Sequence, residues 1–210
     1  MERRAFLSQG LVGAAVLLGP LTHATAAAAA TTPARRPTRT EPPAVRLKRP
    51  LRYAATVHEV TRRLRIPRGR WHCMICHHSG LNTGNATTYD RAHRRRGMEN
   101  GLAYHFVIGN GVDSRDGHIE IGQRWLRQIN GGHVQSEQLN EVAIGLCLVG
   151  NFEQTRPTPR QLAATLELIG CLRELLGPRL RLVSHTEAHP GHTRCPGRYF
   201  PMDHLRQFYG

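Results

Sequence analysis

The sequence predicts a single α/β domain with a central mixed β-sheet and helices on both faces. Two observations lead to this fold class. From Trp71 onward, short apolar segments typical of strands alternate with segments of helical pattern. In addition, Val142–Val149 is a continuous apolar run, which is typical of a central strand covered on both sides. Strands interleaved with helices along the chain favour a mixed sheet with helices on its faces.

Five segments are predicted to be the strands of this sheet. The second of them is closed by Gly109-Asn110-Gly111, which is a turn sequence. The five segments are Trp71–His77, Ala103–Ile108, His118–Gly122, Val142–Val149 and Arg179–Ser184. A short helix is also predicted over Thr87–Arg96, where Gly97 can end it.

The clearest helix signal begins at Thr158. The run Thr158-Pro159-Arg160-Gln161 supplies an N-cap threonine, a proline at the first helical position and a capping-box glutamine. Gly177-Pro178 then ends the pattern. The positions at helical spacing in between are Leu162, Leu166, Ile169, Leu172, Arg173 and Leu176, all apolar except Arg173. We therefore expect a long amphipathic helix that covers the sheet.

Residues 1–30 have the organisation of an export signal peptide and take no part in the predicted fold. Arg3-Arg4 precedes an apolar run over Leu11–Leu21, and small residues suited to cleavage follow. The run is shorter than the roughly 20 residues of a membrane-spanning helix. The paired arginines favour a twin-arginine signal, with an ordinary secretory signal as the alternative. Either signal predicts export from a bacterial cytoplasm to the periplasm or cell wall.

Residues 31–56 are predicted to form a linker rich in proline, arginine and threonine. The segment has too few large apolar groups to offset the loss of chain entropy on folding. The folded domain is therefore predicted over residues 57–210.

Positive charge is concentrated in the N-terminal third of the chain. Residues 1–70 hold 14 of the 29 Lys and Arg residues and 3 of the 15 Asp and Glu residues, so this third carries a net charge of +11. We expect this basic N-terminal arm either to contact an anionic wall or membrane surface or to be a solvated linker. We expect no nucleic acid partner, and we expect a monomer.

Two histidines and a cysteine near strand ends indicate a metal site. His77 ends the first predicted strand, His185 follows the last one, and Cys195 comes ten residues later. Two imidazoles and a thiolate can bind Zn²⁺ and leave the fourth tetrahedral position open for the water that hydrolysis needs. An exported chain with five cysteines has at least one thiol outside any disulfide, and metal ligation is one use for it.

Five sequence blocks carry a family resemblance. They are Cys76-His77-His78-Ser79, GLAYHFVI at 101–108, Gly132-His133 with NEVAIGL at 140–146, TPRQL at 158–162, and SHTE at 184–187 with TRCPG at 193–197. In this order they resemble the zinc-dependent N-acetylmuramoyl-L-alanine amidases of the type-2 group, which includes the peptidoglycan-recognition proteins. The resemblance covers residues 71–200, nearly all of the predicted domain.

The resemblance implies a zinc hydrolase that cleaves the amide between the lactyl group of N-acetylmuramic acid and L-alanine. Its partner would be peptidoglycan or a muropeptide fragment. The implied zinc ligands are His77, His185 and Cys195. Tyr104 and Thr193 match the residues that orient the water and stabilise the oxyanion.

Further residues are expected around the substrate groove. His78 and His105 are expected to contact substrate, and His133 and Asn140 are expected to bind substrate in the groove or to support it. Glu187, two residues after His185, is expected to orient an imidazole ligand from behind it. Glu120 and Glu141 are both candidates for a proton-transfer group, and the sequence does not decide between them.

Two other functions compete with hydrolysis. Cys73-x-x-Cys76-His77 matches the attachment motif of a c-type haem, which would take His77 away from zinc. Alternation along a strand sends the two cysteines to opposite faces, which disfavours haem attachment. The second alternative is a peptidoglycan-binding module without catalysis. The retention of His77, His185 and Cys195 together with Tyr104 and Thr193 favours hydrolysis.

Overall fold

The computed structural model describes residues 50–209. The predicted signal peptide and all of the predicted linker before Pro50 lie outside the described residues. Helical structure begins with α1 (Ala55–Arg63), close to the predicted start of the domain. No helix within residues 50–209 has the length and apolar character needed to cross a membrane.

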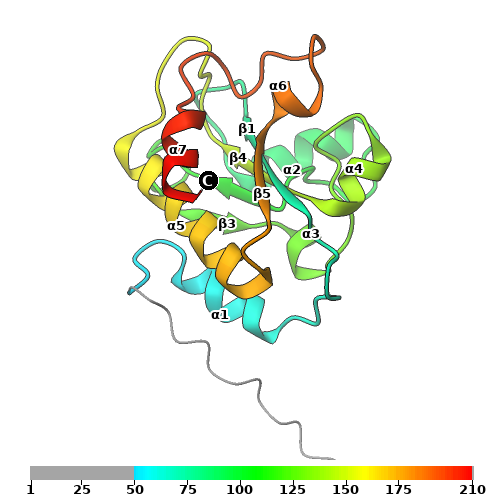
Figure 1. Cartoon of the computed structure of the whole chain (residues 1–210). Helices are drawn as coiled ribbons and strands as arrows, with labels where there is room; N and C mark the ends of the chain where they lie inside the picture. The colour runs from blue at the N-terminus through cyan, green and yellow to red at the C-terminus, as the bar shows by residue number, and fades with distance from the viewer. Residues whose placement is uncertain (1–49, 210) are drawn as a thin grey trace, which may run out of the picture. The chain divides into compact units, whose positions relative to one another are not determined.

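Within the described residues, five strands form one mixed sheet (Figure 1). The strands are β1 (Cys73–His78), β2 (Phe106–Ile108), β3 (Ile119–Ile121), β4 (Ala143–Leu148) and β5 (Arg181–Ser184). Their order across the sheet is β3-β2-β4-β1-β5, and every neighbouring pair is parallel except β2 and β3. All six residues of β4 are buried, which confirms the prediction of a central, doubly covered strand.

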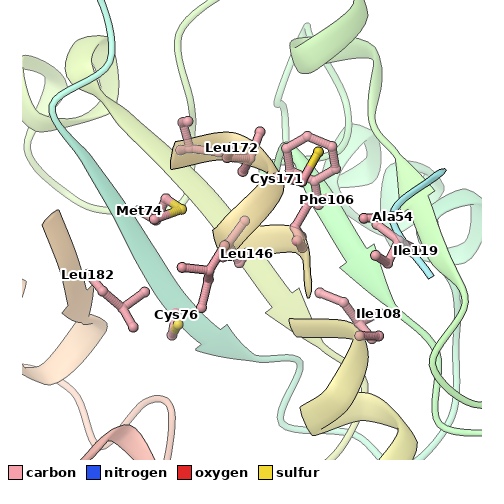
Figure 2. Packing of buried hydrophobic residues seen from close by; sticks show 14 of the residues in the cluster. Ala54, Met74, Cys76, Phe106, Ile108, Ile119, Leu146, Cys171, Leu172 and Leu182 are labelled. Atoms are coloured by element: carbon pink, nitrogen blue, oxygen red, sulfur yellow. The ribbon is translucent and has the colours of Figure 1, made fainter. Parts of the chain in front are cut away.

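Helices cover both faces of the sheet, as the sequence predicts. On one face, α1 and α5 (Pro159–Leu176) pack with α7 (Met202–Tyr209) over the largest apolar cluster (Figure 2). On the other face, Tyr89 of α2 (Ala86–Arg95) packs against Val107 and Cys147, and Leu139 of α4 (Glu137–Val142) packs against Ile75. Two short helices, α3 (Gln123–Leu126) and α6 (His185–Ala188), complete the described fold.

Helix α5 begins with the predicted capping box. The Thr158 hydroxyl accepts a hydrogen bond from the Gln161 N–H, and the Gln161 side chain accepts one from the Thr158 N–H. The Gln161 amide also donates to the carbonyls of Ile108 and Val149, so the cap fastens the helix to β2 and to the end of β4. The buried side of the helix is rotated from the predicted stripe: Ala164 and Leu168 are fully buried, whereas Leu162 and Leu166 are half-buried.

Strand β2 is shorter than predicted. It begins at Phe106 rather than Ala103, because the backbone before it bonds to side chains of α2. The Leu102 N–H donates to the Asp90 carboxylate, and the Ala103 N–H donates to Nδ1 of His93. These contacts occupy the groups that a longer strand would use in its ladder.

The parallel pairing brings four strand ends to one edge of the sheet. Strands β1, β2, β4 and β5 run in the same direction, so their carboxyl ends lie at a single edge. His77 and His78 are the last residues of β1, and His185 directly follows β5. Loops that leave this edge can therefore bring further side chains to His77 and His185.

Glu167 on α5 fastens the start of the described chain to the domain. Its carboxylate accepts hydrogen bonds from the backbone N–H groups of Arg52, Tyr53 and Ala54, just before α1. Hydrogen bonds to a charged group are stronger than those to a neutral one.

We predict that Glu167→Gln lowers the free energy of unfolding by about 1–2 kcal/mol, because one acceptor oxygen and the charge are lost. Urea unfolding followed by circular dichroism measures the change. Glu174→Gln, at an exposed position of the same helix, is the matched control and should change stability by less than about 0.5 kcal/mol. Equal stabilities of the two variants would contradict this role of Glu167.

Candidate metal centre

Three of the predicted site residues converge at the carboxyl edge of the sheet. Nδ1 of His77 lies 3.1 Å from Nδ1 of His185 and 3.7 Å from Sγ of Cys195. All three donor atoms lie within 4.8 Å of one another. Four ligands around one zinc ion, at bonds of about 2.0–2.3 Å, stand roughly 3–4 Å apart. The two His77 distances already fall in that range.

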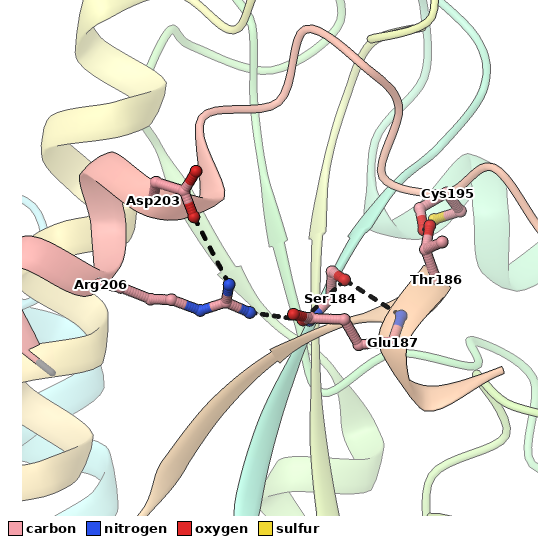
Figure 3. A network of polar contacts seen from close by, with 6 residues as sticks. All are labelled: Ser184, Thr186, Glu187, Cys195, Asp203 and Arg206. Carbon is pink, nitrogen blue, oxygen red and sulfur yellow. Dashed lines mark hydrogen bonds and ion pairs between the residues drawn. The ribbon is translucent and has the colours of Figure 1, made fainter. Parts of the chain in front are cut away.

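Cys195 is held by contacts from β1 and α6. The N–H of His78 donates to its Sγ at 3.3 Å, and its own N–H donates to Oγ1 of Thr193 at 3.1 Å. Its carbonyl accepts from both the N–H and the hydroxyl of Thr186, at 2.8 and 2.6 Å. Thr186 follows His185 directly, so the same contact ties the Cys195 loop to the His185 ligand position. Sequence reasoning missed Thr186, which the structure places beside Cys195 (Figure 3).

Glu187 does not orient an imidazole, and this corrects the prediction. Its carboxylate accepts from the N–H and the hydroxyl of Ser184, and it forms an ion pair with Arg206 of α7 (Figure 3). The Ser184 hydroxyl in turn accepts from the Glu187 N–H, which makes a capping box at the start of α6. Glu187 therefore fixes the turn from β5 into α6 that presents His185.

His133, rather than the Glu187 carboxylate, orients an imidazole of the candidate metal centre. Its Nδ1 lies 3.0 Å from Nε2 of His77, and its Nε2 lies 3.2 Å from the carbonyl oxygen of Ala143. A carbonyl can only accept, so His133 carries its proton on Nε2 and accepts from Nε2–H of His77 through Nδ1. His77 is then left with its Nδ1 lone pair directed at His185 and Cys195. The chain of hydrogen bonds thus selects the tautomer that metal binding requires.

Asn140 and Gly145 hold His133 in place. The Asn140 side chain accepts from the N–H groups of His133 and Val134 and donates to the carbonyl of Val134. The His133 ring lies directly on β4, where a Cβ added to Gly145 would come within 2.4 Å of its Cδ2. His133 and Asn140 are both buried, so they support His77 from the interior of the domain.

Burial keeps the candidate ligands neutral. It holds the pKa of His77 well below the usual value of 6.5, with His133 and His185 adding to the effect, and it lowers the pKa of His185 to about 4. Burial also raises the pKa of the Cys195 thiol to about 12, against the opposite effect of the His78 N–H. Neutral imidazoles are ready to bind a metal, whereas the thiol must lose its proton as the metal binds. This donor set fits zinc.

Tyr104 lies beside His77 and His133. Its ring centroid is 5.2 Å from that of His77 and 6.4 Å from that of His133. Burial, with the nearby thiols of Cys147 and Cys195, raises the pKa of Tyr104 well above 10, so the hydroxyl keeps its proton. A protonated hydroxyl at this position is a hydrogen-bond donor.

His105 does not line the site, which corrects the prediction that it contacts substrate. It has no exposed surface, its Nδ1 accepts from the Gly145 N–H, and its Nε2 lies 3.3 Å from the Ile129 carbonyl. Trp71 and Trp125 pack against its ring. With both nitrogens engaged in the core, His105 holds the chain before β2 to β4.

His78 lies next to the centre but is not one of its candidate ligands. Its Nδ1 accepts from the Phe152 N–H at 3.1 Å, and its ring lies near that of Phe152 rather than beside His77. The ring is half-buried. A contact between His78 and substrate remains a prediction.

The two glutamates considered for proton transfer differ in position. Glu120 pairs with Val107, Val107 with Cys147, and Cys147 with His77, so Glu120 belongs to the same cross-strand row as His77. Its Oε2 accepts from the Ala86 N–H at the start of α2. Glu141 is exposed on α4. The structure therefore places Glu120, and not Glu141, on the face of the sheet that carries the metal centre.

The structure does not support haem attachment. Cys73 packs with Ile75 on one face of the sheet, and Cys76 packs with Met74 on the other. Both sulfurs are buried, and one porphyrin cannot reach both without dismantling β1. These two cysteines, with Cys147 and Cys171, act as small buried apolar residues.

The geometry agrees with the outcome of comparison with known families. Residues 67–198 match the family described as N-acetylmuramoyl-L-alanine amidase, and this match spans more than half of the chain. The chain belongs to this amidase family. The resemblance seen in the sequence blocks is thereby confirmed.

Relatives of this amidase-family chain include recognition proteins and amidases. It is 33% identical over 109 residues to a peptidoglycan-recognition protein of Drosophila simulans, covering 51% of this chain and 53% of that protein. It is 37% identical over 70 residues to peptidoglycan recognition protein 1 of Mus musculus, covering 33% of this chain and 34% of that protein. The chain thus spans about half or less of the curated relatives it matches.

Solved structures share the fold. The endolysin N-acetylmuramoyl-L-alanine amidase LysCS from Clostridium intestinale matches with a TM-score of 0.57 and 27% identity, covering 66% of this chain and 82% of that one. PGRP-SA of Apis mellifera matches with a TM-score of 0.53 and 21% identity, covering 66% and 82%. The second likeness concerns the fold alone.

We predict that His133→Gln weakens zinc binding by about 10–100-fold, because the His77 imidazole loses the partner that fixes its tautomer. Competition with a chromophoric zinc chelator measures the affinity. Gly145→Ala should act in the same direction by displacing the His133 ring. His118→Gln, at an exposed histidine of another loop, is the control. Wild-type zinc affinity in His133→Gln would refute the orienting role.

Proposed function

We propose that this chain is a zinc-dependent N-acetylmuramoyl-L-alanine amidase that hydrolyses the amide between the muramic lactyl group and L-alanine in peptidoglycan. The observation that carries the proposal is the convergence of His77, His185 and Cys195, beside Tyr104, in a fold of the amidase family. The substrate would be wall polymer or soluble muropeptide. Wall polymer lies outside the cytoplasm, which agrees with the export signal expected at residues 1–30.

The residues of the site have separable roles in this reaction. His77, His185 and Cys195 would hold the zinc ion. When bound, zinc lowers the pKa of a coordinated water and polarises the carbonyl under attack. Tyr104 donates its hydroxyl hydrogen to the oxygen on which negative charge develops. The Tyr104 hydroxyl is protonated near neutral pH, and its raised pKa extends this state to more basic pH.

Thr193 is proposed as a second donor to the same oxygen. Its Oγ1 accepts from the Cys195 N–H, and this contact positions the hydroxyl while leaving its hydrogen free to donate. A hydroxyl brings no charge, so it stabilises an anion less than an ammonium group would. Because Thr193 also holds the Cys195 loop, its loss would affect both metal binding and catalysis.

A peptidoglycan-binding module is the second candidate function. The recognition proteins among the relatives of this chain favour it. The two candidates share a ligand and differ in whether an amide is cut. Metal analysis of the purified full-length protein, run alongside a peptidoglycan digest, separates them. Zinc with release of new L-alanine amino termini supports the amidase, and zinc without release supports the binding module.

We predict that Cys195→Ser reduces zinc content and abolishes most cleavage, because a hydroxyl is a far poorer zinc ligand than a thiolate. Atomic absorption on the purified variant gives the metal content, and the digest gives the activity. Cys171→Ser, at a buried cysteine on α5, is the control and should keep its zinc. Full activity in Cys195→Ser would remove this residue from the ligand set.

We predict that Tyr104→Phe lowers kcat by about 10²–10³-fold while zinc content stays unchanged, because a single oxyanion donor is lost. Steady-state kinetics on a soluble muropeptide, together with metal analysis, makes the measurement. Tyr199→Phe, at a 38% exposed tyrosine, is the matched control. A parallel loss of zinc and activity in Tyr104→Phe would instead indicate a structural role.

A further inference from the structure

A groove lies at the opposite end of the sheet from the metal centre. Its central hollow, about 260 Å³, is bounded by the end of α1, the connection from α1 to β1 and the end of α5. A second hollow shares Gly69, Trp71 and Leu176 with it, and a third shares Arg70. Because the hollows have walls in common, we treat them as one surface and call it the arginine groove.

The arginine groove is strongly basic. The arginines that line it include Arg62, Arg68 and Arg70 in the central hollow, Arg179 and Arg181 in the second, and Arg127 in the third. Among the described residues that line the three hollows, none is acidic. Glu59 lies outside the lining and pairs with Arg62 alone among these arginines. Positive charge gathered in a concave surface with few counter-charges attracts anions.

Two of these guanidinium groups have donors without a protein acceptor. Nε of Arg62 and Nε of Arg70 are both buried and make no hydrogen bond. Arg62 otherwise contacts Glu59 through Nη1 at 3.7 Å, whereas Arg70 donates through Nη2 to Asn130 and lies over the Trp71 ring. Neither Nε is accessible from outside, so an anion in the groove would contact these two side chains through their Nη groups.

The chemistry of the lining selects the class of anion. Arginine presents a planar fork of N–H groups that matches two oxygens of a phosphate, and its charge persists at any pH of interest. The arginines are spread along three neighbouring hollows that share lining residues, which suits a ligand with repeated charges. The floor between them is apolar, from Leu64, Ile66 and Leu175, and can accept the uncharged links between phosphates.

We propose that the arginine groove binds a polymer of repeating phosphodiesters, such as an anionic polymer of the cell envelope. The groove lies beside His72, just before β1, and the metal centre lies at His77. Five residues of strand span about 17 Å at roughly 3.3 Å each, so polymer in the groove leaves the metal edge free. Bound polymer would hold the protein at the envelope. This binding does not depend on the proposed amidase activity.

The test measures binding of a synthetic poly(glycerol phosphate) oligomer to the full-length protein by isothermal titration calorimetry. We expect Arg68→Gln/Arg179→Gln to weaken binding by about 10-fold or more and to reduce the salt dependence of the affinity. Both side chains are exposed, so folding should be preserved. Arg91→Gln/Arg95→Gln, which removes two exposed arginines from α2, is matched in charge and should change affinity less than about 3-fold.

A second variant tests the planar geometry of the guanidinium donors rather than the charge. Arg70→Lys keeps the positive charge but loses Nε and the planar pair of donors. We expect it to weaken binding several-fold at an unchanged net charge. Melting temperature confirms that Arg70→Lys is folded, since the substitution also removes the contact with Asn130.

Three outcomes would overturn the proposal. Equal losses in the two double variants would mean that binding follows net charge alone. Equal affinity for poly-glutamate of the same length would mean that phosphate is not selected. Groove-dependent binding to phosphatidylglycerol vesicles without binding of the free oligomer would assign the surface to a membrane. Zinc content and muropeptide cleavage should be unaffected by the groove variants, so failure of the amidase proposal remains distinguishable.

Discussion

The register between β1 and β5 is the constraint on which the candidate metal centre depends. Cys76 pairs with Ser184 in these parallel strands, so His77 and His185 leave neighbouring strand ends at one edge. Side chains alternate along a strand, and a slip of one residue would turn the His77 imidazole toward the opposite face. The buried apolar side chains of Met74 and Leu182 oppose such a slip, because it would remove them from the cluster under α5. The same register between β1 and β5 is therefore required for core packing and for the placement of the candidate ligands.

The remaining parts of the centre arrive on loops, and hydrogen bonds replace the sheet as the positioning force. Cys195 is held through Thr186 and the His78 N–H, and His133 is held through Asn140 and Ala143. Most of these groups are partly or fully buried, so losing one partner leaves the other unpaired in a medium of low polarity. The same burial that makes these contacts strong also keeps the imidazoles neutral. Burial therefore both fixes these side chains in position and keeps the imidazoles in the neutral state that metal binding needs.

The two ends of the sheet differ in electrostatic character. The carboxyl edge of the sheet holds uncharged candidate metal ligands that are partly or fully buried. The amino edge holds the arginines of the arginine groove, and the described residues that line this groove include no acidic side chain. The separation of about 17 Å along β1 exceeds the roughly 8–10 Å over which charges act in physiological salt. An anion held by the arginine groove would therefore have little effect on protonation at the metal centre. The proposed attachment surface and the candidate metal centre would therefore act independently.

Local patterns in the sequence determined the central strand, the capping box at Thr158 and the ligand motifs, because each depends on residues close together in the chain. They also predicted correctly that Cys73 and Cys76 face opposite sides. The burial of His105, the pairing of Glu187 with Arg206 and the support of His77 by His133 were decided by tertiary structure alone. Each of these depends on which way a side chain turns and on contacts between residues far apart in the chain, 56 positions for His77 and His133. Spacing in the sequence shows that an imidazole is present, but only packing decides whether it faces a metal, a substrate or the core.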